Sequence, residues 1–331
     1  MATIEINNWV AVILFIIFII ILIILIILLV QGLEATNKYF FIKELNLPQR
    51  YGPNSWVLIT GASSGQGKEF ALNFAERGFN VLLIGSPRTQ STINIINDKY
   101  PNIKTQFILK DFGKAFEDDF FNSIIEAIDE LDISILINNV GHRTGWIGYE
   151  NMPYKMIKET IATGTIIQAR LSQLVLPKFL KRSPKSAIIN ITAQSMHPNF
   201  GFGIGLSNEI SVPYLSVYEA SNAFGFYHAN SLQKEYGKII DMLNITPGAV
   251  ITENTQFLAD TWFNIDAKQF VNNVMKMLGN VQGTTCAYWG HAISSYLINI
   301  CPWNKEEILH ETGKTIAENY MLHHQDKSYN I

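Results

Sequence analysis

Charged residues and cysteines are scarce in this 331-residue chain. Only 16% of the residues are charged while 48% are hydrophobic, and 25 Lys and Arg nearly balance 28 Asp and Glu, for a formal net charge of -3. Such a composition excludes a disordered chain, which combines low hydrophobicity with high net charge. No cluster of Lys and Arg is present either. We therefore expect no nucleic acid partner, because binding one requires basic groups that neutralise its phosphates.

The 2 cysteines, Cys286 and Cys301, are too few for a disulfide scaffold. Neither stands in a CxxC or His–Cys spacing that would indicate a metal site. The histidines are scattered, and the adjacent pair His323 and His324 would point apart on a helix. We therefore expect two buried or half-buried thiols and no metal cofactor.

One long apolar run stands near the N-terminus. Trp9–Val30 contains no charged side chain, and as a helix it is roughly 33 Å long, enough to cross a hydrocarbon core of about 30 Å. A signal peptide is the alternative, but its apolar run is shorter, and residues 1–8 lack the Lys or Arg that usually begins one. We predict a single-pass anchor in a lipid bilayer over residues 1–31, followed by a juxtamembrane linker over residues 32–52.

Beyond Pro53, short apolar runs alternate with amphipathic stretches of helical length, which is typical of an α/β fold with a parallel sheet. We predict one such domain over residues 53–303 and a C-terminal amphipathic helix with a tail over residues 304–331. Helices are expected over Gly67–Arg77 and Lys155–Phe179. The strand candidates are Trp56–Thr60, Asn80–Ile84, Lys104–Leu109, Ser134–Asn138, Ser186–Ile191 and Asp241–Ile245.

The strongest local motif is W-V-L-I-T-G-A-S-S-G-Q-G-K-E-F-A, in which an apolar strand runs into a glycine-rich turn that opens a helix. Gly61, Gly65 and Gly67 allow the backbone to turn tightly and to approach a pyrophosphate, whose charge is favoured at a helix N-terminus. With the second apolar run N-V-L-L-I at the expected distance, the motif predicts a dinucleotide site.

Further motifs follow in a familiar order: K-D-F, L-I-N-N-V-G, L-V-L-P, I-I-N-I-T, V-Y-E-A-S-N and T-P-G-A-V-I-T. Together with the glycine turn they resemble the short-chain dehydrogenase/reductases, and most of all their membrane-bound steroid dehydrogenase and 3-ketoacyl-CoA reductase branch. The resemblance extends over residues 51–303. It implies a doubly wound parallel sheet, the Rossmann fold, with NAD or NADP lying across the carboxyl ends of the strands.

The resemblance also implies roles for single residues at the nucleotide. Where relatives that use NADPH place an Arg just after the second strand, this chain has Ser86, and Arg88 would reach a 2′-phosphate only if the turn differs. NAD and NADP both stay open. The implied cofactor-binding residues are Thr60, Gly61, Gly65 and Gly67 at the pyrophosphate, Arg88 at the 2′-phosphate, Asp111 at the adenine, Asn139 and Gly141 at the ribose side, and Pro247, Gly248 and Thr252 at the nicotinamide.

Family members reduce a carbonyl with a Tyr, a Lys four residues later, a Ser and an Asn. Tyr218 matches the Tyr, but the positions of the Asn, Ser and Lys hold Gly164, Ala193 and Asn222. The pKa of an unperturbed tyrosine is about 10, so the side chain exchanges protons readily at neutral pH only where a nearby cation lowers that pKa. Asn222, at the position of the family's Lys, carries no charge. The hydroxyls that could replace the missing Ser are those of Thr192, Ser195, Ser207 and Ser211.

These losses favour a membrane-anchored pseudoenzyme that retains a nicotinamide nucleotide and serves as an accessory subunit of a membrane complex, such as a mitochondrial respiratory complex. The alternative is an active NAD(P)H-dependent reductase of steroid or 3-ketoacyl-CoA substrates. The membrane would be the mitochondrial inner membrane or the endoplasmic reticulum. For a complex subunit, the expected partner surfaces are the loop Met196–Leu215 and the helix Asn304–His324.

Overall fold

The computed structural model describes residues 2–141, 147–193, 213–253, 255 and 261–300, together with residues 307, 310, 311, 313–315, 317 and 318. Cys301, Ser195, Ser207, Ser211 and most of the two expected partner surfaces lie outside these residues. The chain forms two compact units, Met1–Ile42 and Lys43–Ile331, and each is described by itself.

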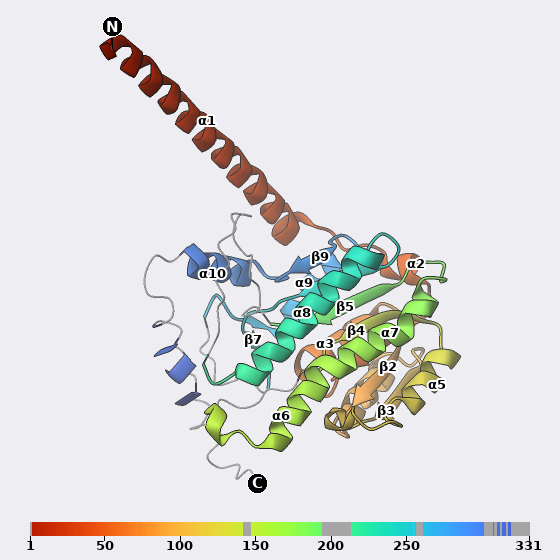
Figure 1. Ribbon diagram of the computed structural model, residues 1–331. Helices are drawn as coiled ribbons and strands as arrows, with labels where there is room; N and C mark the ends of the chain where they lie inside the picture. The colour runs from red at the N-terminus through yellow and green to blue at the C-terminus, as the bar shows by residue number, and fades with distance from the viewer. Residues whose placement is uncertain are drawn as a thin grey trace. The chain divides into compact units, whose positions relative to one another are not determined.

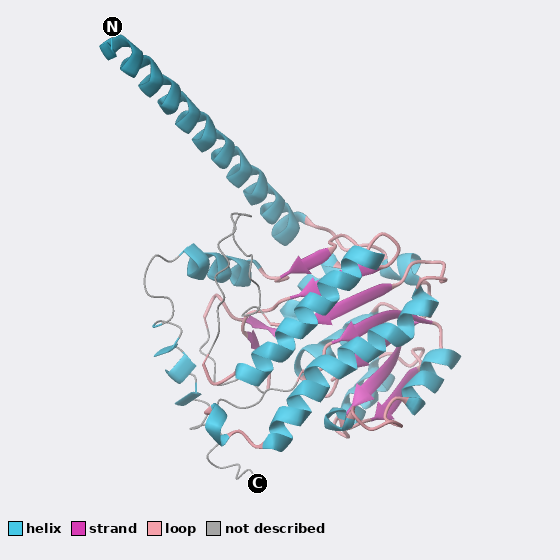
Figure 2. Ribbon diagram, viewed as in Figure 1, coloured by secondary structure: helices cyan, strands magenta, loops and turns pink. Residues whose placement is uncertain are grey.

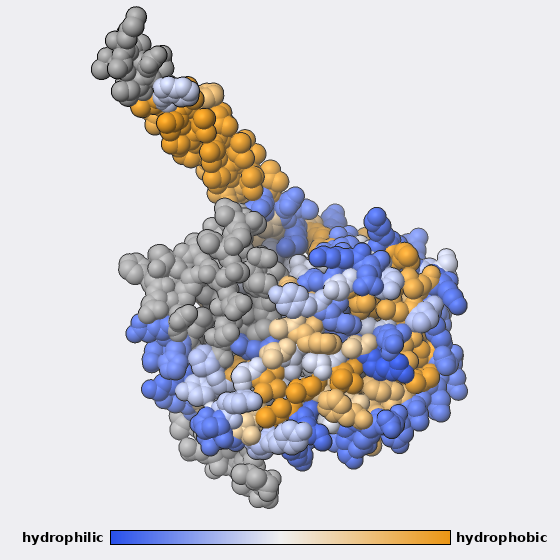
Figure 3. Space-filling model, in the orientation of Figure 1, coloured by the Kyte–Doolittle hydropathy of each residue, from blue (hydrophilic) through white to orange (hydrophobic). Residues whose placement is uncertain are grey.

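The first unit is the helix α1 (Ala2–Thr36), continued by the π-helical turn η1 (Asn37–Phe41). Within the described residues, Trp9–Phe41 is the one segment long and apolar enough to cross a membrane. The face of this segment drawn in Figure 3 is apolar over most of its length, and side chains such as Phe15 are more than half exposed. An apolar helix with no polar face needs an apolar surrounding, which a lipid bilayer provides.

The second unit is built on a seven-stranded sheet in the order β3-β2-β1-β4-β5-β6-β9, in which every pair is parallel (Figure 1). Its central strands are buried on both faces, as their continuous Val, Leu and Ile runs predict. The prediction of a doubly wound parallel sheet is confirmed. The strands are β1 (Trp56–Thr60), β2 (Asn80–Gly85), β3 (Thr105–Leu109), β4 (Ile133–Asn138), β5 (Ala187–Ile191), β6 (Asp241–Ile245) and β9 (Gly283–Thr285), with a separate pair β7 (Val250–Ile251) and β8 (Ile265–Asp266).

Helices cover both faces of the sheet. On one face α7 and α8 lie over the sheet, roughly along the strands (Figure 2), and on the other α3 packs against α4 and α9. The single helix expected over Lys155–Phe179 is divided by a π-helical turn at its middle. The helices and helical turns are α2 (Leu47–Tyr51), α3 (Gly65–Glu76), α4 (Thr89–Lys99), η2 (Phe112–Lys114), α5 (Asn122–Glu130), η3 (Tyr149–Asn151), α6 (Tyr154–Ile161), η4 (Ala162–Ile166), α7 (Ile167–Phe179), α8 (Ser216–Tyr236), α9 (Ala267–Met277) and α10 (Trp289–Ile300).

A ladder of buried amides fixes the register of the strands that lead to the site. Asn138, Asn190 and Asn244 are paired residues on β4, β5 and β6. The Nδ2 of Asn138 donates to Oδ1 of Asn190 (2.9 Å), and that of Asn190 donates to Oδ1 of Asn244 (3.1 Å). A one-residue slip would bury these amides without partners, so the ladder favours a single alignment of the three carboxyl ends.

The amino edge of the sheet holds the segment that follows the anchor. Asp241, at the start of β6, is 1% exposed and accepts hydrogen bonds from Arg50 Nε (2.6 Å) and Tyr51 Oη (2.8 Å) on α2. Burial alone would raise the pKa of Asp241, but the hydrogen bonds from Arg50 and Tyr51 hold it below its usual value. The end of the predicted linker is thus packed into the second unit.

Candidate active site

The glycine-rich turn between β1 and α3 is closely packed and leaves no room for a side chain at Gly67. Gly61 and Gly65 have φ of +72° and +54°, in the left-handed region that glycine adopts freely. A Cβ on Gly67 would lie 2.3 Å from the carbonyl oxygen of Gly61. This is a cradle in which the backbone of the turn can approach a phosphate closely, at the N-terminus of α3.

The turn is tied to the end of β4, where the strand order reverses and where ligands of this fold class bind. Asn139 Nδ2 donates to the carbonyl oxygen of Thr60 (2.9 Å), and Thr60 Oγ1 accepts from the backbone N–H groups of Asn139 and Val140 (3.1 Å each). Of the residues expected at the nucleotide, Thr60, Gly61, Gly67 and Asn139 therefore meet at one point.

The loop after β6 reaches the same place from the other side. The side chain of Thr252 would be 3.0 Å from a Cβ on Gly65, so these two expected cofactor residues are neighbours. Thr255 holds the loop by donating its Oγ1 hydrogen to the carbonyl oxygen of Val250 (2.7 Å). Pro247 is buried and Gly248 half-buried at the carboxyl end of β6, while Gly141 is exposed after β4.

A histidine on α10 holds the middle of this loop. The ring of His291 is 1% exposed, and its Nε2 donates to the carbonyl oxygen of Ala249 (3.1 Å), next to Gly248. Burial lowers the pKa of His291 to about 4, although backbone hydrogen bonds with Ala249 and Cys286 favour the protonated ring. The imidazole is therefore neutral at pH 7 and acts here as a hydrogen-bond donor.

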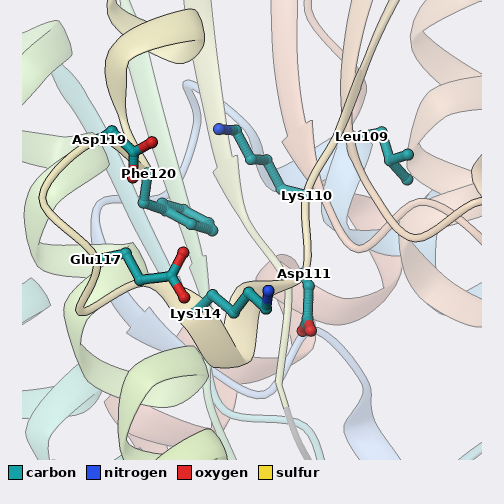
Figure 4. Close-up of a pocket in the computed structure, with 7 residues that line it drawn as sticks. All are labelled: Leu109, Lys110, Asp111, Lys114, Glu117, Asp119 and Phe120. Carbon is teal, nitrogen blue, oxygen red and sulfur yellow. The ribbon is translucent and has the colours of Figure 1, made fainter.

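A hollow of about 330 Å³ lies beyond the end of β3, where Asp111 was expected at the adenine (Figure 4). The ring of Phe120 forms part of its wall, with the Nζ of Lys110 5.0 Å from the ring centroid. Asp111 Oδ1 accepts from the backbone N–H of Gly113 (3.1 Å), which fixes the turn. The hollow is lined by Leu109, Lys110, Asp111, Lys114, Glu117, Asp119 and Phe120.

The end of β2 carries the two residues that bear on the nucleotide's 2′ position. Ser86 follows the strand directly and is half-buried, whereas Arg88 is exposed at the N-cap of α4. The Arg88 carbonyl accepts from Ser91 Oγ (2.8 Å). Arg88 therefore stands two residues beyond the position where relatives that use NADPH place their Arg.

Tyr218 lies in the first turn of α8, with Asn222 one turn later. The Nδ2 of Asn222 donates to the backbone carbonyl of Tyr218 (2.9 Å), so this amide is directed along its own helix. Tyr218 is half-buried and packs against Leu215 and Ala317. A segment near the C-terminus thus contributes to the surroundings of the tyrosine.

Gly164 stands where the turn η4 packs against α8. A Cβ there would lie 2.7 Å from Cβ of Ser221 on α8, so the backbone position that the family fills with Asn has no room for a side chain. Gly164 also lies within the π-helical turn η4, a feature often found at functional sites. Tight packing, rather than a proton relay, explains the glycine.

The hydroxyl of Thr192 does not replace the missing Ser. Thr192 is 7% exposed, and its Oγ1 donates to the carbonyl oxygen of Ile245 (3.2 Å), which ties β5 to β6. Ala193 follows it with no polar atom in its side chain. The other three candidate hydroxyls lie outside the described residues.

Comparison with known proteins identifies the fold and its family. A family model described as short chain dehydrogenase matches residues 55–261, which is more than half of the chain. The chain belongs to the short-chain dehydrogenase family. The very-long-chain 3-oxoacyl-CoA reductase of Bos taurus is 28% identical over 280 residues, which cover 80% of this chain and 82% of that protein. A Caenorhabditis elegans protein named as a steroid dehydrogenase is 31% identical over 281 residues, covering 82% and 83% of the two chains.

Solved structures agree on the architecture. A 7β-hydroxysteroid dehydrogenase superposes with a TM-score of 0.66 at 18% identity, covering 81% of this chain and 100% of that chain. A short-chain dehydrogenase from Sphingobium yanoikuyae in complex with NADPH superposes with a TM-score of 0.57 at 24% identity. The superposition covers 70% of this chain and 87% of that chain. At such identities the likeness concerns the fold alone.

The expectation of a catalytically inactive accessory subunit is wrong. The relatives that match about four-fifths of the chain are named as reductases and as a dehydrogenase, which points to an active oxidoreductase. That expectation gave three single positions more weight than the likeness of the whole chain. The mitochondrial setting, which depended on it, has no support among the relatives.

Two structural features of the site region were not anticipated. The role of His291, which holds the loop after β6, has no signal in the sequence, because a hydrogen bond to a backbone carbonyl requires no residue spacing. The amide ladder had a visible signal, because each of three consecutive strand candidates carries an Asn near its carboxyl end, namely Asn138, Asn190 and Asn244.

Proposed function

We propose that this chain is a membrane-anchored, NAD(P)H-dependent reductase that converts the 3-keto group of a long-chain 3-oxoacyl-CoA into a hydroxyl group. The observation that carries the proposal is the likeness to very-long-chain 3-oxoacyl-CoA reductases of Bos taurus and Aspergillus niger, which covers 80% and 81% of this chain. The likeness extends well beyond the glycine-rich turn, because it covers about four-fifths of the chain.

The residues at the glycine turn fit a nicotinamide nucleotide. Gly67 keeps the cradle open, and Gly61 and Gly65 supply the backbone conformations that it requires. A bound nucleotide of this kind supplies a hydride. We assign Thr60 and Asn139 to holding the turn against β4, Asp111 to the adenine end, and Thr252 to the nicotinamide end. With Ser86 after β2 and Arg88 further along, both NADH and NADPH are expected to bind.

We assign proton delivery to the hydroxyl of Tyr218. Reduction of a ketone needs a proton at the carbonyl oxygen, and a positioned acid contributes about 10²–10⁴-fold to the rate. Asn222 brings no charge to this tyrosine, Ala193 no hydroxyl and Gly164 no amide. We therefore expect slow turnover, with correct placement of the substrate supplying most of the acceleration.

The anchor suits a substrate with a long acyl chain. Such a chain partitions into a bilayer, because each buried CH₂ group contributes about 0.8 kcal/mol to transfer out of water. We propose a single-pass protein of the endoplasmic reticulum, one of the two membranes expected from the sequence, with the bilayer as its partner.

A second candidate substrate is a steroid ketone. It is favoured by the Caenorhabditis elegans relative named as a steroid dehydrogenase, whose identity to this chain is 31%. Both substrates undergo the same reaction, hydride transfer to a carbonyl, so the site residues keep the roles assigned above.

Turnover assays on the purified full chain in lipid nanodiscs test the proposal. NADPH and NADH would be offered with 3-oxoacyl-CoA substrates of increasing chain length and, separately, with steroid ketones. Oxidation of the nucleotide that requires the long 3-oxoacyl-CoA is the expected result. No turnover with any of these ketones, by protein that still binds the nucleotide, would overturn the proposed function.

A further inference from the structure

Helix α10 separates its residues into a buried and an exposed stripe. His291 and Ser295, one turn apart, are 1% and 4% exposed and face the domain. Ile293 and Leu297, also one turn apart, are 40% and 48% exposed. In a water-soluble helix the exposed stripe carries the polar side chains. Here the exposed stripe is aliphatic, which reverses that pattern.

The sequence of α10 and of its flanks contains no charged residue that would add a polar side chain to this stripe. From Cys286 to Trp303 the chain contains no Asp, Glu, Lys or Arg. At 12 residues, α10 is about 18 Å long, too short to cross a hydrocarbon core of about 30 Å. A helix of this kind suits a position in the plane of a membrane surface rather than across it.

A tryptophan from another part of the chain enlarges the exposed stripe. Trp262 is 60% exposed, and its ring centroid lies 5.7 Å from that of Trp289, which begins α10 one turn before Ile293. The carbonyl oxygen of Trp262 accepts a hydrogen bond from Tyr288 Oη (2.8 Å), which fixes the two segments to each other. We call Trp262, Ile293 and Leu297 the docking face. Tryptophan is enriched where a membrane meets water.

The unit that carries this face follows the candidate membrane-crossing segment directly in the chain. The membrane-crossing segment ends at Phe41, and the second unit begins at Lys43, whose carbonyl accepts from Asn280 Nδ2 (2.8 Å). From Asn280 to Trp289 the chain can extend at most about 30 Å. The docking face therefore lies on the unit that the chain joins directly to its candidate membrane-crossing segment.

We propose that the docking face binds the surface of the lipid bilayer in which α1 is anchored, as a second membrane contact. Exposed apolar patches on soluble domains mark interaction sites, and lipid is the apolar partner that this chain itself supplies at high local concentration. The buried stripe of the same helix holds the loop after β6 through His291 and Ala249. Docking would thus set the orientation of the proposed active site toward the membrane.

Spin labelling of the full chain tests the contact. Nitroxides would be placed by Ile293→Cys and Leu297→Cys in nanodiscs that hold one copy each. Tyr227→Cys on α8, where the native side chain is 61% exposed, is the matched control. The unsubstituted chain, treated with the same reagent, gives the background from its own cysteines. Accessibility is then measured with oxygen, which is enriched in lipid, and with a water-soluble nickel chelate.

We expect the labels at positions 293 and 297 to be several-fold more accessible to oxygen and several-fold less accessible to the nickel chelate than the label at position 227. Equal access of the chelate to all three positions would overturn the proposal, because the face would then be in water. Protection from both reagents would also overturn it, since it indicates a protein partner. The readout requires no turnover and therefore does not depend on the proposed reaction.

Discussion

Tyr218 is the residue on which the proposed chemistry depends most. Tyr218→Phe removes the hydroxyl and keeps the ring that packs against Leu215 and Ala317. We expect turnover to fall by about 10²-fold or more, because a positioned proton donor is lost, with nucleotide affinity unchanged. Steady-state rates and calorimetry with NADPH measure the two quantities. Tyr227→Phe, on the exposed side of the same helix, should alter neither; an equal loss there would indicate that the effect is structural.

Nucleotide preference depends on the residue that follows β2. Ser86→Arg places a guanidinium where relatives that use NADPH have one, and we expect it to raise the affinity for NADPH by about 10-fold relative to NADH, since a charge-assisted hydrogen bond to the 2′-phosphate contributes about 1.5 kcal/mol or more. Arg88→Ala should lower NADPH affinity if Arg88 already reaches that phosphate. Calorimetric titration with both nucleotides measures the preference, and identical ratios in all three proteins would contradict these assignments.

Asp241 should make stability depend on pH. Its pKa is held below its usual value by Arg50 and Tyr51, so its contribution is present above about pH 4 and is lost as the pH falls through the lowered pKa. Asp241→Asn should therefore cost about 3 kcal/mol at pH 7, the lower end for a buried ion pair because Arg50 is partly exposed, and progressively less below pH 4. Melting temperatures in detergent, compared with the exposed Asp118→Asn control, measure the difference. A difference that stays constant between pH 7 and pH 3 would contradict this prediction.

Single residues were predictable from the sequence where a backbone requirement selects a residue type. The glycines of the turn, with Thr60 and Asn139 beside them, meet as expected because the strand order brings their loops together. The role of Thr192 could not be assigned from the sequence, since its hydroxyl donates a hydrogen bond to a carbonyl oxygen on the neighbouring strand. The contact of His291 with Ala249 was equally hidden, because it joins residues 42 positions apart.

The contact between the middle of the divided α6–η4–α7 helix and α8 allows a prediction about packing. Gly164→Ala places a Cβ 2.7 Å from Cβ of Ser221, and we expect a loss of about 1–3 kcal/mol from overpacking. Ser221→Gly in the same protein removes the opposing atom and should restore much of the stability, apart from the cost of a second glycine in a helix. Melting of the single and double variants measures the coupling. If the losses of stability in the two single variants simply add in the double variant, then η4 and α8 do not contact each other at Gly164 and Ser221.

Regular elements were predicted well where the sequence carries a continuous apolar run. The bounds of β1 and β6 agree with the expected strands, because these runs are buried on both faces and end at polar or glycine residues. The short strands β7, β8 and β9 were not anticipated, since two or three residues carry no period. The π-helical turn η4, which packs against α8, was not anticipated either, since the local sequence carries no signal that distinguishes it from an α-helix.

At the scale of the whole molecule, ordered motifs along the chain predicted the family and the doubly wound sheet, and both are confirmed. The conclusion about activity failed at this scale. Gly164, Ala193 and Asn222 were interpreted as the loss of a working unit, yet the relatives that match the chain over most of its length are named as reductases. The residues at these three positions affect how a proton reaches the substrate. They do not determine whether the nucleotide transfers a hydride.

Transfer of deuterium from a labelled nucleotide tests the central claim most directly. The full chain in nanodiscs would be incubated with a long-chain 3-oxoacyl-CoA and with NADPH or NADH carrying deuterium at C4 of the nicotinamide, on one face or the other, and the product would be analysed by mass spectrometry. We predict a 3-hydroxyacyl-CoA with one deuterium at C3, formed from one labelled face only and greatly reduced in Tyr218→Phe. Recovery of unreduced 3-oxoacyl-CoA with the nucleotide bound and unchanged would contradict the proposed reductase activity.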